Sequence, residues 1–463
     1  MLPSLFTERM HRLLGEQAAL LETWQSTPLT TRGVRVNTLK CCAEQLCRLL
    51  PLSLKPTPFS PVGFVTETSF AAGRDPLHHA GAYYMQEPSA MSAVTLLSPQ
   101  PGERVLDLCA APGGKSTQIA AALGHTGLLW ANEYVPARAR VLAQNLERCG
   151  VRRAVVSVGD TARLAEALPA YFDAVLADVP CSGEGMFRKE PEAFSGWSED
   201  NVRLCAARSE EILHNAAACV RPGGRLVVST CTFAPEENEW AIIRFLHAHP
   251  DFTLEEAALP FGQAGFSAEQ VASFGEAALL PFARTQPLSH TRRIFPWHGG
   301  EGHFLALLRR AGEGDTPYPR TVEAKPDSMA AEVYAQCFCE APNGVFLRTG
   351  DTVRLIPSDL PEARGVHVLC AGVAVGEVIG GRTPRIEPCH AAFQSAAAAD
   401  CRSLLNLTYN DPRLAAFLRG EELRDDAAGG WTGVAVEGVM CGFGKATGGR
   451  LKNRYPKGLR LLG

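Results

Sequence analysis

The sequence lacks a hydrophobic run long enough to cross a membrane, which needs about 20 consecutive apolar residues. The N-terminal segment MLPSLFTERMHRLLGE mixes acidic and basic residues with its apolar ones, so it has no h-region of a secretory signal peptide. The chain also has no internal repeat and no low-complexity tract. These absences argue against a membrane protein or a repeat array, and we expect a cytoplasmic protein.

An excess of positive charge is also missing, because 45 Lys and Arg residues face 49 Asp and Glu residues and the net charge is −4. A uniformly basic nucleic-acid-binding protein is therefore excluded, and any surface for nucleic acid must be local. Hydrophobic residues make up 46% and charged residues 20% of the 463 positions, which is ordinary for a soluble globular protein. This length suffices for roughly two to four domains.

Zinc-finger spacing is absent, although the chain contains 15 cysteines. Cys41 and Cys42 are adjacent, and a single residue separates Cys337 from Cys339. Neither pair is followed by a matching Cys/His pair at the right distance. In a large chain without a signal peptide, reduced thiols are expected. We therefore predict no metal site.

The middle of the sequence alternates short apolar strands with helical stretches. The predicted strands cover residues 105–108, 127–133, 154–160, 172–180 and 225–230. Nearly continuous apolar strands in such an alternation predict an α/β domain with a doubly wound, Rossmann-like parallel sheet. Ligands of these sheets bind at the carboxyl ends of the strands.

The regions on either side of this alternation have weaker patterns. Apolar residues on one face predict helix over residues 1–30, and alternation predicts a half-buried strand over residues 33–40. Irregular structure is expected over residues 255–300, before a strand-like run that ends near residue 310.

The turn after the first strand of the alternation, CAAPGGKS, consists mostly of residues with small side chains. Its Ala and Gly residues let backbone amides approach a ligand closely at the start of the following helix. Turns of this kind are common in α/β domains, so this one alone is only suggestive. It matches neither the dinucleotide fingerprint G-x-G-x-x-G nor a P-loop.

Acidic residues follow four successive strands: Asp107, Glu133, Asp160 and Asp178. A carboxylate after the second strand suits a ribose diol, because it accepts both hydroxyl protons. Four acids would repel a pyrophosphate but tolerate S-adenosylmethionine, which carries a sulfonium and an ammonium and has no phosphate. One acid at such a place is usually a solvated loop residue, whereas four favour an S-adenosylmethionine site.

Cysteines follow the fourth and fifth strands, Cys181 in DVPCSGEGMFRK and Cys231 in STCT. A lone buried cysteine is usually a small apolar filler, but these two lie at the edge where the ligand is expected. Methylation of a pyrimidine at carbon 5 needs a thiolate, because its addition to carbon 6 makes carbon 5 nucleophilic. Asp178 can hydrogen-bond nitrogen 3 of the base and stabilise the developing charge. A base must then remove the carbon-5 proton so that the thiolate can leave.

Together these stretches resemble the signatures of the Nol/Nop/Sun family of RNA cytosine-5 methyltransferases. CAAPGGKS, DVPCSGEGMFRK and STCT occur in the family's order, and GVRVNTLK, YYMQEPSA, WSEDN and GEGHFLALLR also match. Within the family the chain is most similar to the RsmF-type bacterial enzymes that modify small-subunit (16S) ribosomal RNA, because of RKEPEAFSGWS and GGRLKNRYPKGLR. The second of these segments resembles their PUA-like RNA-binding module.

The resemblance implies a role for each matching residue. Cys231 corresponds to the nucleophile, Cys181 to the cysteine that assists release of the methylated RNA, and Lys189 to a basic position beside the catalytic loop. Asp178 would lie near the target base as well as the cofactor. The positions that match the cofactor-binding ones are Cys109, Ala110, Ala111, Pro112, Gly113, Gly114, Lys115, Glu133, Asp160 and Asp178.

The resemblance also implies how the chain is divided. We expect an N-terminal α+β domain that positions RNA at residues 1–92 and an S-adenosylmethionine-dependent methyltransferase domain at 93–311. A run rich in Gly, Pro and charge at residues 312–327 is the predicted linker. A small α+β domain at 328–392 and a β-rich, PUA-like RNA-binding domain at 393–463 would follow. The partners would be the cofactor and ribosomal RNA or the small ribosomal subunit, and the enzyme would act as a monomer away from membranes.

The end of the chain carries a cluster of positive charge. Residues 441–463 contain no acid and six cations: Lys445, Arg450, Lys452, Arg454, Lys457 and Arg460. Such runs are more often solvated surfaces, but this one suits contacts with RNA phosphates.

Three other readings remain open at this level. A DNA cytosine-5 methyltransferase would use Cys181 as its nucleophile, and the Thr-Cys site at Cys231 argues against it. A non-catalytic ribosome-assembly factor would not need the intact cysteines and acids. A transfer RNA substrate is the main alternative, because relatives share the catalytic motifs and differ in their appended domains.

Overall fold

The computed structural model describes residues 2–29, 31–67, 69–314, 319–380, 384–424 and 429–461. Parts of the predicted linker and basic tail, residues 315–318 and 462–463, lie outside the described residues, as do Met1, Thr30, Thr68, 381–383 and 425–428 of the predicted domains. Among the described residues, no helix has both the length and the apolar character that crossing a bilayer requires.

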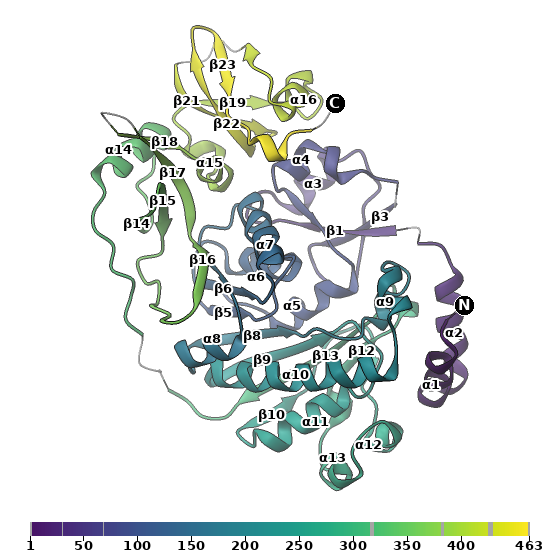
Figure 1. The fold of residues 1–463 in the computed structure, drawn as a ribbon. Coiled ribbons are helices and arrows are strands. Elements are labelled where there is room, and N and C mark those ends of the chain that lie inside the picture. Colours follow the sequence, from purple (N-terminus) through teal and green to yellow (C-terminus); the bar gives the residue numbers. More distant parts are fainter. Residues whose placement is uncertain are drawn as a thin grey trace.

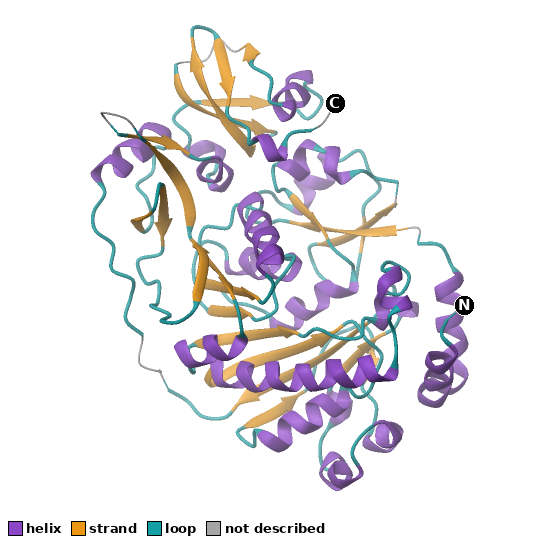
Figure 2. Cartoon of the chain, in the orientation of Figure 1, coloured by secondary structure: helices purple, strands orange, loops and turns teal. Residues whose placement is uncertain are grey.

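The largest sheet has ten strands, in the order β11–β12–β13–β9–β8–β5–β6–β7–β16, with β10 beside β13 (Figures 1 and 2). Its centre consists of parallel strands, as predicted. These are β5 (Arg104–Asp107), β6 (Leu128–Glu133), β7 (Ala154–Val158), β8 (Phe172–Asp178) and β9 (Val220–Thr230).

Helices cover both faces of this sheet, because alternate strand residues enter two separate cores. Leu106 and Trp130 pack with helices α8 (Thr161–Ala167), α10 (Glu199–Cys219) and α11 (Glu239–Ala248). Val105 and Leu129 point to the other face and pack with α5 (Ser92–Leu97), α6 (Gly114–Leu123) and α7 (Pro136–Arg148). Strands buried on both faces are the reason for the continuous apolar runs in the sequence.

Antiparallel strands extend the sheet at both edges. At one edge β13 (His303–Arg310) pairs with β9. Beyond it in the sheet lie β12 (Arg292–Ile294) and then β11 (Gln263–Ala264), while β10 (Phe252–Glu255) pairs with the C-terminal half of β13. At the other edge β16 (His367–Ala371) pairs with β7. The expectation of irregular structure over residues 255–300 was therefore wrong for β11 and β12, which are too short to show a clear periodicity.

The N-terminal residues form the predicted helices and a small sheet, whose first strand covers Thr31–Val36 instead of the predicted residues 33–40. Helices α1 (Ser4–Leu14) and α2 (Ala18–Ser26) pack with Trp197 and with Trp240 of α11. The sheet order is β2–β3–β1–β4. Its elements are β1 (Thr31–Val36), β2 (Lys55–Pro56), β3 (Gly63–Glu67) and β4 (Tyr83–Met85), with α3 (Ala43–Leu49) and α4 (Pro76–His79).

The C-terminal part of the chain contains two further sheets (Figure 1). One consists of β14 (Val345–Thr349), β15 (Thr352–Ile356), β17 (Val373–Ile379) and β18 (Arg385–Pro388), next to α14 (Ser328–Cys337) and α15 (His390–Ser395). The other consists of β19 (Leu404–Leu407), β20 (Leu423–Arg424), β21 (Gly430–Val436), β22 (Val439–Thr447) and β23 (Arg450–Asn453), with α16 (Pro412–Arg419).

The last sheet packs on the N-terminal domain, because Val34 and Leu77 share one apolar core with Leu407 and Val436. The side chain of Gln394 on α15 donates to the backbone carbonyls of His79, 3.1 Å away, and Arg148, 2.9 Å away. Helix α15 thereby joins the C-terminal part to both the N-terminal domain and α7.

Candidate active site

The predicted site residues meet at the carboxyl ends of the central strands. Asp107 ends β5 and Asp178 ends β8, and these strands are neighbours in the sheet. Cys181 lies in the loop after β8 and Cys231 directly follows β9. The parallel register pairs Asp178 with Ser229, so the ends of β8 and β9 lie side by side. The sheet therefore places the two acids and the two cysteines at one edge, where α/β sheets bind their ligands.

The two thiols are in direct contact. The Sγ atoms of Cys181 and Cys231 are 3.4 Å apart. The contact with Cys231 and burial raise the pKa of Cys181 well above its usual value. Cys181 therefore carries its proton at neutral pH and can donate it in a hydrogen bond to the sulfur of Cys231.

A buried carboxyl group connects the two loops that carry these thiols. Glu237 is fully buried, and it accepts hydrogen bonds from the backbone N–H of Ser182 (2.9 Å) and from its Oγ (2.5 Å). The Oγ atoms of Ser182 and Thr232 lie 2.8 Å apart. Because these residues directly follow Cys181 and Cys231, the network determines how the two thiols face each other. Burial raises the pKa of Glu237 to about 8.

Asp178 is held by two partners beside the thiols. Its Oδ2 accepts from Lys115 Nζ at 2.8 Å, and its Oδ1 accepts from Ser229 Oγ at 2.6 Å. Burial opposes the charge of Asp178, but the Lys115 ammonium and the other partners outweigh it, so the pKa of this carboxyl group is lowered. Asp178 is therefore a carboxylate at neutral pH, with fixed orientation, and can accept a hydrogen bond from a donor on a bound ligand.

The loop before α6 fits the expected cofactor. Gly113 adopts φ +108 at the N-cap of α6, a backbone conformation that favours glycine. Asp107 Oδ2 accepts from Ser116 Oγ at 2.6 Å, while Asp107 Oδ1 is buried without a hydrogen-bond partner among the described residues. Burial raises the pKa of Asp107 to about 7. An unpaired buried acceptor beside a small-residue turn suits a ligand that brings a donor such as an ammonium.

The other predicted cofactor residues lie along the same edge. Glu133 ends β6 and is 4% exposed, and its Oε1 accepts from the backbone N–H of Val135 at 2.9 Å. Asp160 follows β7 and caps α8 through the N–H of Ala162. Burial raises the pKa of Cys109, so this thiol is unsuited to act as a nucleophile and belongs to the turn.

Lys189 lies next to Glu301, whose backbone N–H donates to Glu87 Oε1 at 3.0 Å. It is 3.8 Å from Glu301, which also accepts two hydrogen bonds from Arg188, at 2.7 and 3.2 Å. Arg188 stacks on Trp24 of α2, with 4.9 Å between its Cζ and the ring centroid. Lys189 thus belongs to a group of charges that ties the N-terminal helices to the catalytic domain.

The structure adds three residues that received no role from the sequence. Ser89 Oγ is 2.6 Å from Glu87 Oε2 and 3.1 Å from His303 Nδ1. His303 is 5% exposed, and its titration is coupled electrostatically to Lys115 and Asp178. Glu87 and Ser89 lie in YYMQEPSA, and His303 lies in GEGHFLALLR, two of the segments on which the family resemblance rests. Their meeting at the site depends on the pairing of β13 with β9, which no local pattern specifies.

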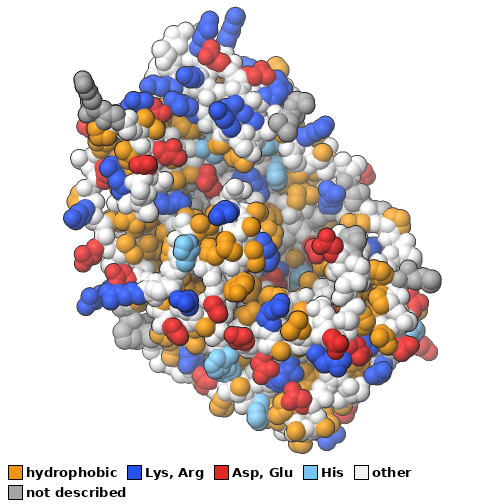
Figure 3. Space-filling model, viewed as in Figure 1, with side chains coloured by type: hydrophobic (Ala, Val, Ile, Leu, Met, Phe, Trp, Pro, Cys, Tyr) orange, Lys and Arg blue, Asp and Glu red, His pale blue; other side chains and the backbone are white. Residues whose placement is uncertain are grey.

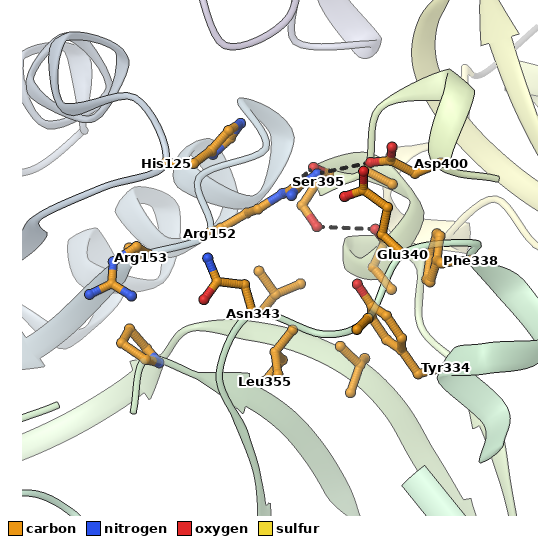
Figure 4. Close-up of a pocket in the computed structure, with 16 residues that line it drawn as sticks. His125, Arg152, Arg153, Tyr334, Phe338, Glu340, Asn343, Leu355, Ser395 and Asp400 are labelled. Carbon is orange, nitrogen blue, oxygen red and sulfur yellow. Dashed lines mark hydrogen bonds and ion pairs between the residues drawn. The ribbon is translucent and has the colours of Figure 1, made fainter. Parts of the chain in front are cut away.

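A separate cavity of about 140 Å³ lies between the catalytic domain and the C-terminal part (Figure 4). Arg152 donates to the backbone carbonyl of Ser395 at 2.8 Å and lies 3.6 Å from Asp400. None of the predicted catalytic or cofactor-binding residues lines this cavity.

The basic C-terminal segment forms part of the surface of the last sheet. Lys445 on β22 and Lys452 on β23 are exposed and directly opposite each other. Arg450 and Arg454 are instead paired, at 3.4 Å from Glu422 and 3.2 Å from Glu387. Lys and Arg side chains gather over this end of the molecule, at the top of Figure 3. Like charges placed opposite each other destabilise a sheet, unless an anion binds there.

Comparison with known families matches three segments of the chain. Residues 94–309 match the 16S rRNA methyltransferase RsmB/F family, and residues 2–88 match the N-terminal domain of the 16S rRNA methyltransferase RsmF. Residues 405–461 match the methyltransferase RsmF PUA domain.

Individual relatives match over nearly the whole length. The ribosomal RNA small subunit methyltransferase F of Erwinia tasmaniensis is 32% identical, over 99% of this chain and 96% of the relative. The protein of the same name from Vibrio vulnificus is 30% identical, over 99% and 97%. Among solved structures, a methyltransferase homologue from Pyrococcus horikoshii has 29% identity and a TM-score of 0.58, covering 66% of this chain and 95% of its own.

Proposed function

Because the chain belongs to the RsmF family of 16S ribosomal RNA methyltransferases, we propose that it methylates cytosine at carbon 5 in that RNA, through a covalent bond to Cys231. The observation that carries this proposal is the contact between two thiols, 3.4 Å apart, beside the fixed Asp178 carboxylate. Carbon 5 of cytosine is a poor nucleophile, and a thiol that adds to carbon 6 is the usual way to activate it.

The chain's side chains divide the work at the base. Cys231 adds to carbon 6, its thiol proton passes to nitrogen 3 of the base, and the Asp178 carboxylate accepts a hydrogen bond from that N3–H. Lys115 and Ser229 keep that carboxylate charged and oriented. Cys181 donates its S–H to the sulfur of Cys231, which makes Cys231 a better leaving group when the product is released.

The cofactor S-adenosylmethionine supplies the methyl group when it is bound. Glu133 would accept hydrogen bonds from the ribose hydroxyls, and Asp160 would hold the adenine edge. Asp107 and Lys115 complete the polar wall. The turn between β5 and α6 permits close approach of the ligand, because most of its side chains are small; it consists of Cys109, Ala110, Ala111, Pro112, Gly113 and Gly114.

The remaining domains bind and position the RNA. The PUA domain offers Lys445 and Lys452 to phosphates, and Lys189 lies on the wall that leads from the N-terminal helices to the thiols. The enzyme acts as a cytoplasmic monomer.

We further propose that the chain is divided into residues 1–92, 93–311, 312–327, 328–392 and 393–463. Strand β16 belongs to the fourth of these segments, and it completes the catalytic sheet by pairing with β7.

Adduct trapping tests the chemistry and the order of the two cysteines. The variants Cys231→Ala and Cys181→Ala are incubated with 16S ribosomal RNA and S-adenosylmethionine, and analysed by denaturing gel electrophoresis. Cys231→Ala should form no adduct, whereas Cys181→Ala should accumulate an RNA–protein adduct because the thiolate leaves slowly. An adduct that persists in Cys231→Ala and is lost in Cys181→Ala would reverse the assignment.

Bisulfite sequencing tests the substrate. RNA from cells that lack the gene should lose 5-methylcytosine in 16S ribosomal RNA and regain it with the wild-type gene, but not with Cys231→Ala. Loss of the mark from transfer RNA, with 16S RNA unchanged, would contradict the proposed substrate and leave the reaction class intact.

A further inference from the structure

The chemistry proposed above leaves one role unfilled. After methyl transfer, the proton on carbon 5 must be removed before the thiolate of Cys231 can leave. Cys181 is the nearest thiol, but it carries a proton of its own and faces the sulfur of Cys231. A protonated thiol is a poor proton acceptor, and a neutral imidazole at the same edge of the sheet is better suited to this role.

The strand pairing sets His303 at the same edge of the sheet as the nucleophile. It is the first residue of β13, whose next residue, Phe304, pairs with Thr230 of β9. Leu305 pairs with Ser229, and residues two apart on a strand project to the same face, so His303 shares the face of Leu305 and Ser229. Opposed residues of an antiparallel pair project to the same face of the sheet. Asp178 pairs with Ser229 and accepts its hydroxyl, so the carboxylate lies on that face too.

A chain of hydrogen bonds sets the tautomer of this imidazole. Ser89 Oγ donates its only proton to Glu87 Oε2 at 2.6 Å, because a carboxylate can only accept. The same Oγ is 3.1 Å from His303 Nδ1, so it must accept a proton from that nitrogen. Nδ1 therefore carries the hydrogen, and Nε2 is the nitrogen that can accept one. A carboxylate at the far end of such a chain stabilises the imidazolium as it forms.

We propose that His303 is the general base of the reaction and accepts the carbon-5 proton of the methylated base at Nε2. The inference rests on the proposed cytosine-5 methylation. In this step the C5–H bond breaks and its proton passes to Nε2, while its electron pair forms the C5=C6 double bond. The C6–S bond then breaks, and its electron pair leaves with the sulfur of Cys231. The imidazolium afterwards loses its proton to solvent, and no oxidant or reductant is needed.

The charges around His303 keep it ready for this role. Burial and the Lys115 ammonium lower its pKa to about 4, although Glu87 and Asp178 favour the charged form. The imidazole is therefore neutral at physiological pH and free to accept a proton.

Single-turnover measurements separate proton removal from methyl transfer. RNA carrying tritium at carbon 5 of cytosine reports removal of the hydrogen, and methyl-labelled S-adenosylmethionine reports transfer. In His303→Phe, methyl transfer should stay near the wild-type rate, whereas tritium release should slow by about 10²–10⁴-fold, the usual contribution of a general base. The methylated adduct should accumulate on denaturing gels.

Chemical rescue distinguishes a proton acceptor from a residue that only packs. Added imidazole should restore tritium release in His303→Ala and have no effect on Cys181→Ala. Ser89→Ala, which keeps the imidazole but removes its orienting partner, should slow tritium release less than His303→Phe. The control His298→Phe changes a histidine that bonds the backbone of Phe295 and should match the wild type.

A readout without the cofactor adds a second check. When Cys231 adds to unmethylated RNA, water can exchange with the hydrogen at carbon 5, and loss of the base should slow this exchange in His303→Phe. Equal slowing of methyl transfer and tritium release, without rescue by imidazole, would show that His303 is only structural and overturn the inference. If the wild type itself releases no tritium, the proposed cytosine-5 chemistry fails instead.

Discussion

The Sγ atoms of Cys181 and Cys231 lie 3.4 Å apart, although 50 positions separate these residues in the chain. Two neighbouring parallel strands, β8 and β9, deliver them to the same edge, and the Ser182–Glu237 hydrogen bonds connect the loops that follow. A protonated thiol next to a nucleophilic one can stabilise the thiolate both before addition and after departure.

The first prediction concerns the lifetime of the covalent adduct. Cys181→Ser retains a hydroxyl that can donate to Cys231, whereas Cys181→Ala retains no donor. After a chase with unlabelled RNA, the adduct should decay fastest in the wild type, more slowly in Cys181→Ser and most slowly in Cys181→Ala. Equal decay rates in the two variants would mean that the thiol does not act as a hydrogen-bond donor.

The second prediction concerns the cofactor. Replacing Glu133 by Ala removes a buried carboxylate that should bind the ribose hydroxyls, and it should weaken S-adenosylmethionine binding by about 1–3 kcal/mol. Isothermal titration calorimetry measures the change, and Glu166→Ala on the exposed side of α8 is the control. An affinity unchanged in Glu133→Ala would rule out this assignment.

The third prediction concerns the PUA surface. Lys445→Ala and Lys452→Ala should each reduce the slope of log affinity for RNA against log salt by roughly one unit, if each contacts a phosphate. Binding of S-adenosylmethionine should not change. Lys325→Ala, in an exposed segment far from this sheet in the sequence, is the control. The same salt slope in all variants would show that the two lysines are only solvated and do not contact RNA phosphates.

The fourth prediction concerns pH. Burial raises the pKa of Glu237 from 4.5 to about 8, so between these values the folded state holds a proton that the unfolded state releases. This group's contribution to stability is complete below about pH 4.5 and is lost as the pH rises through about 8, with a slope of at most about 1.4 kcal/mol per pH unit. Glu237→Gln should remove that dependence from the free energy of unfolding, measured by denaturant titration at several pH values. The exposed control Glu8→Gln should retain it.

Local patterns in the sequence were sufficient for the central strands and most of their helices. The predicted strand at residues 225–230 begins earlier, at Val220, because the Pro-Gly-Gly turn is part of an extended segment whose pairing with β8 shifts register near Phe172. The assignments of Cys231, Cys181, Asp178, Lys189 and the cofactor loop stay predictions. The structure brings the thiols, Asp178 and Lys115 together, and it places Lys189 beside Glu301 instead.

The sequence by itself determined the parallel core and the carboxyl-end placement of the acids and cysteines, because apolar periodicity and small-residue turns are local properties. Only the tertiary structure decided which strands flank that core. The antiparallel pairing of β13 with β9 sets His303 at the edge of the sheet that carries Cys231, and the loop after β4 brings Glu87 and Ser89 to the same imidazole. The Ser89–His303 contact joins residues 214 positions apart, a separation that no sequence period encodes.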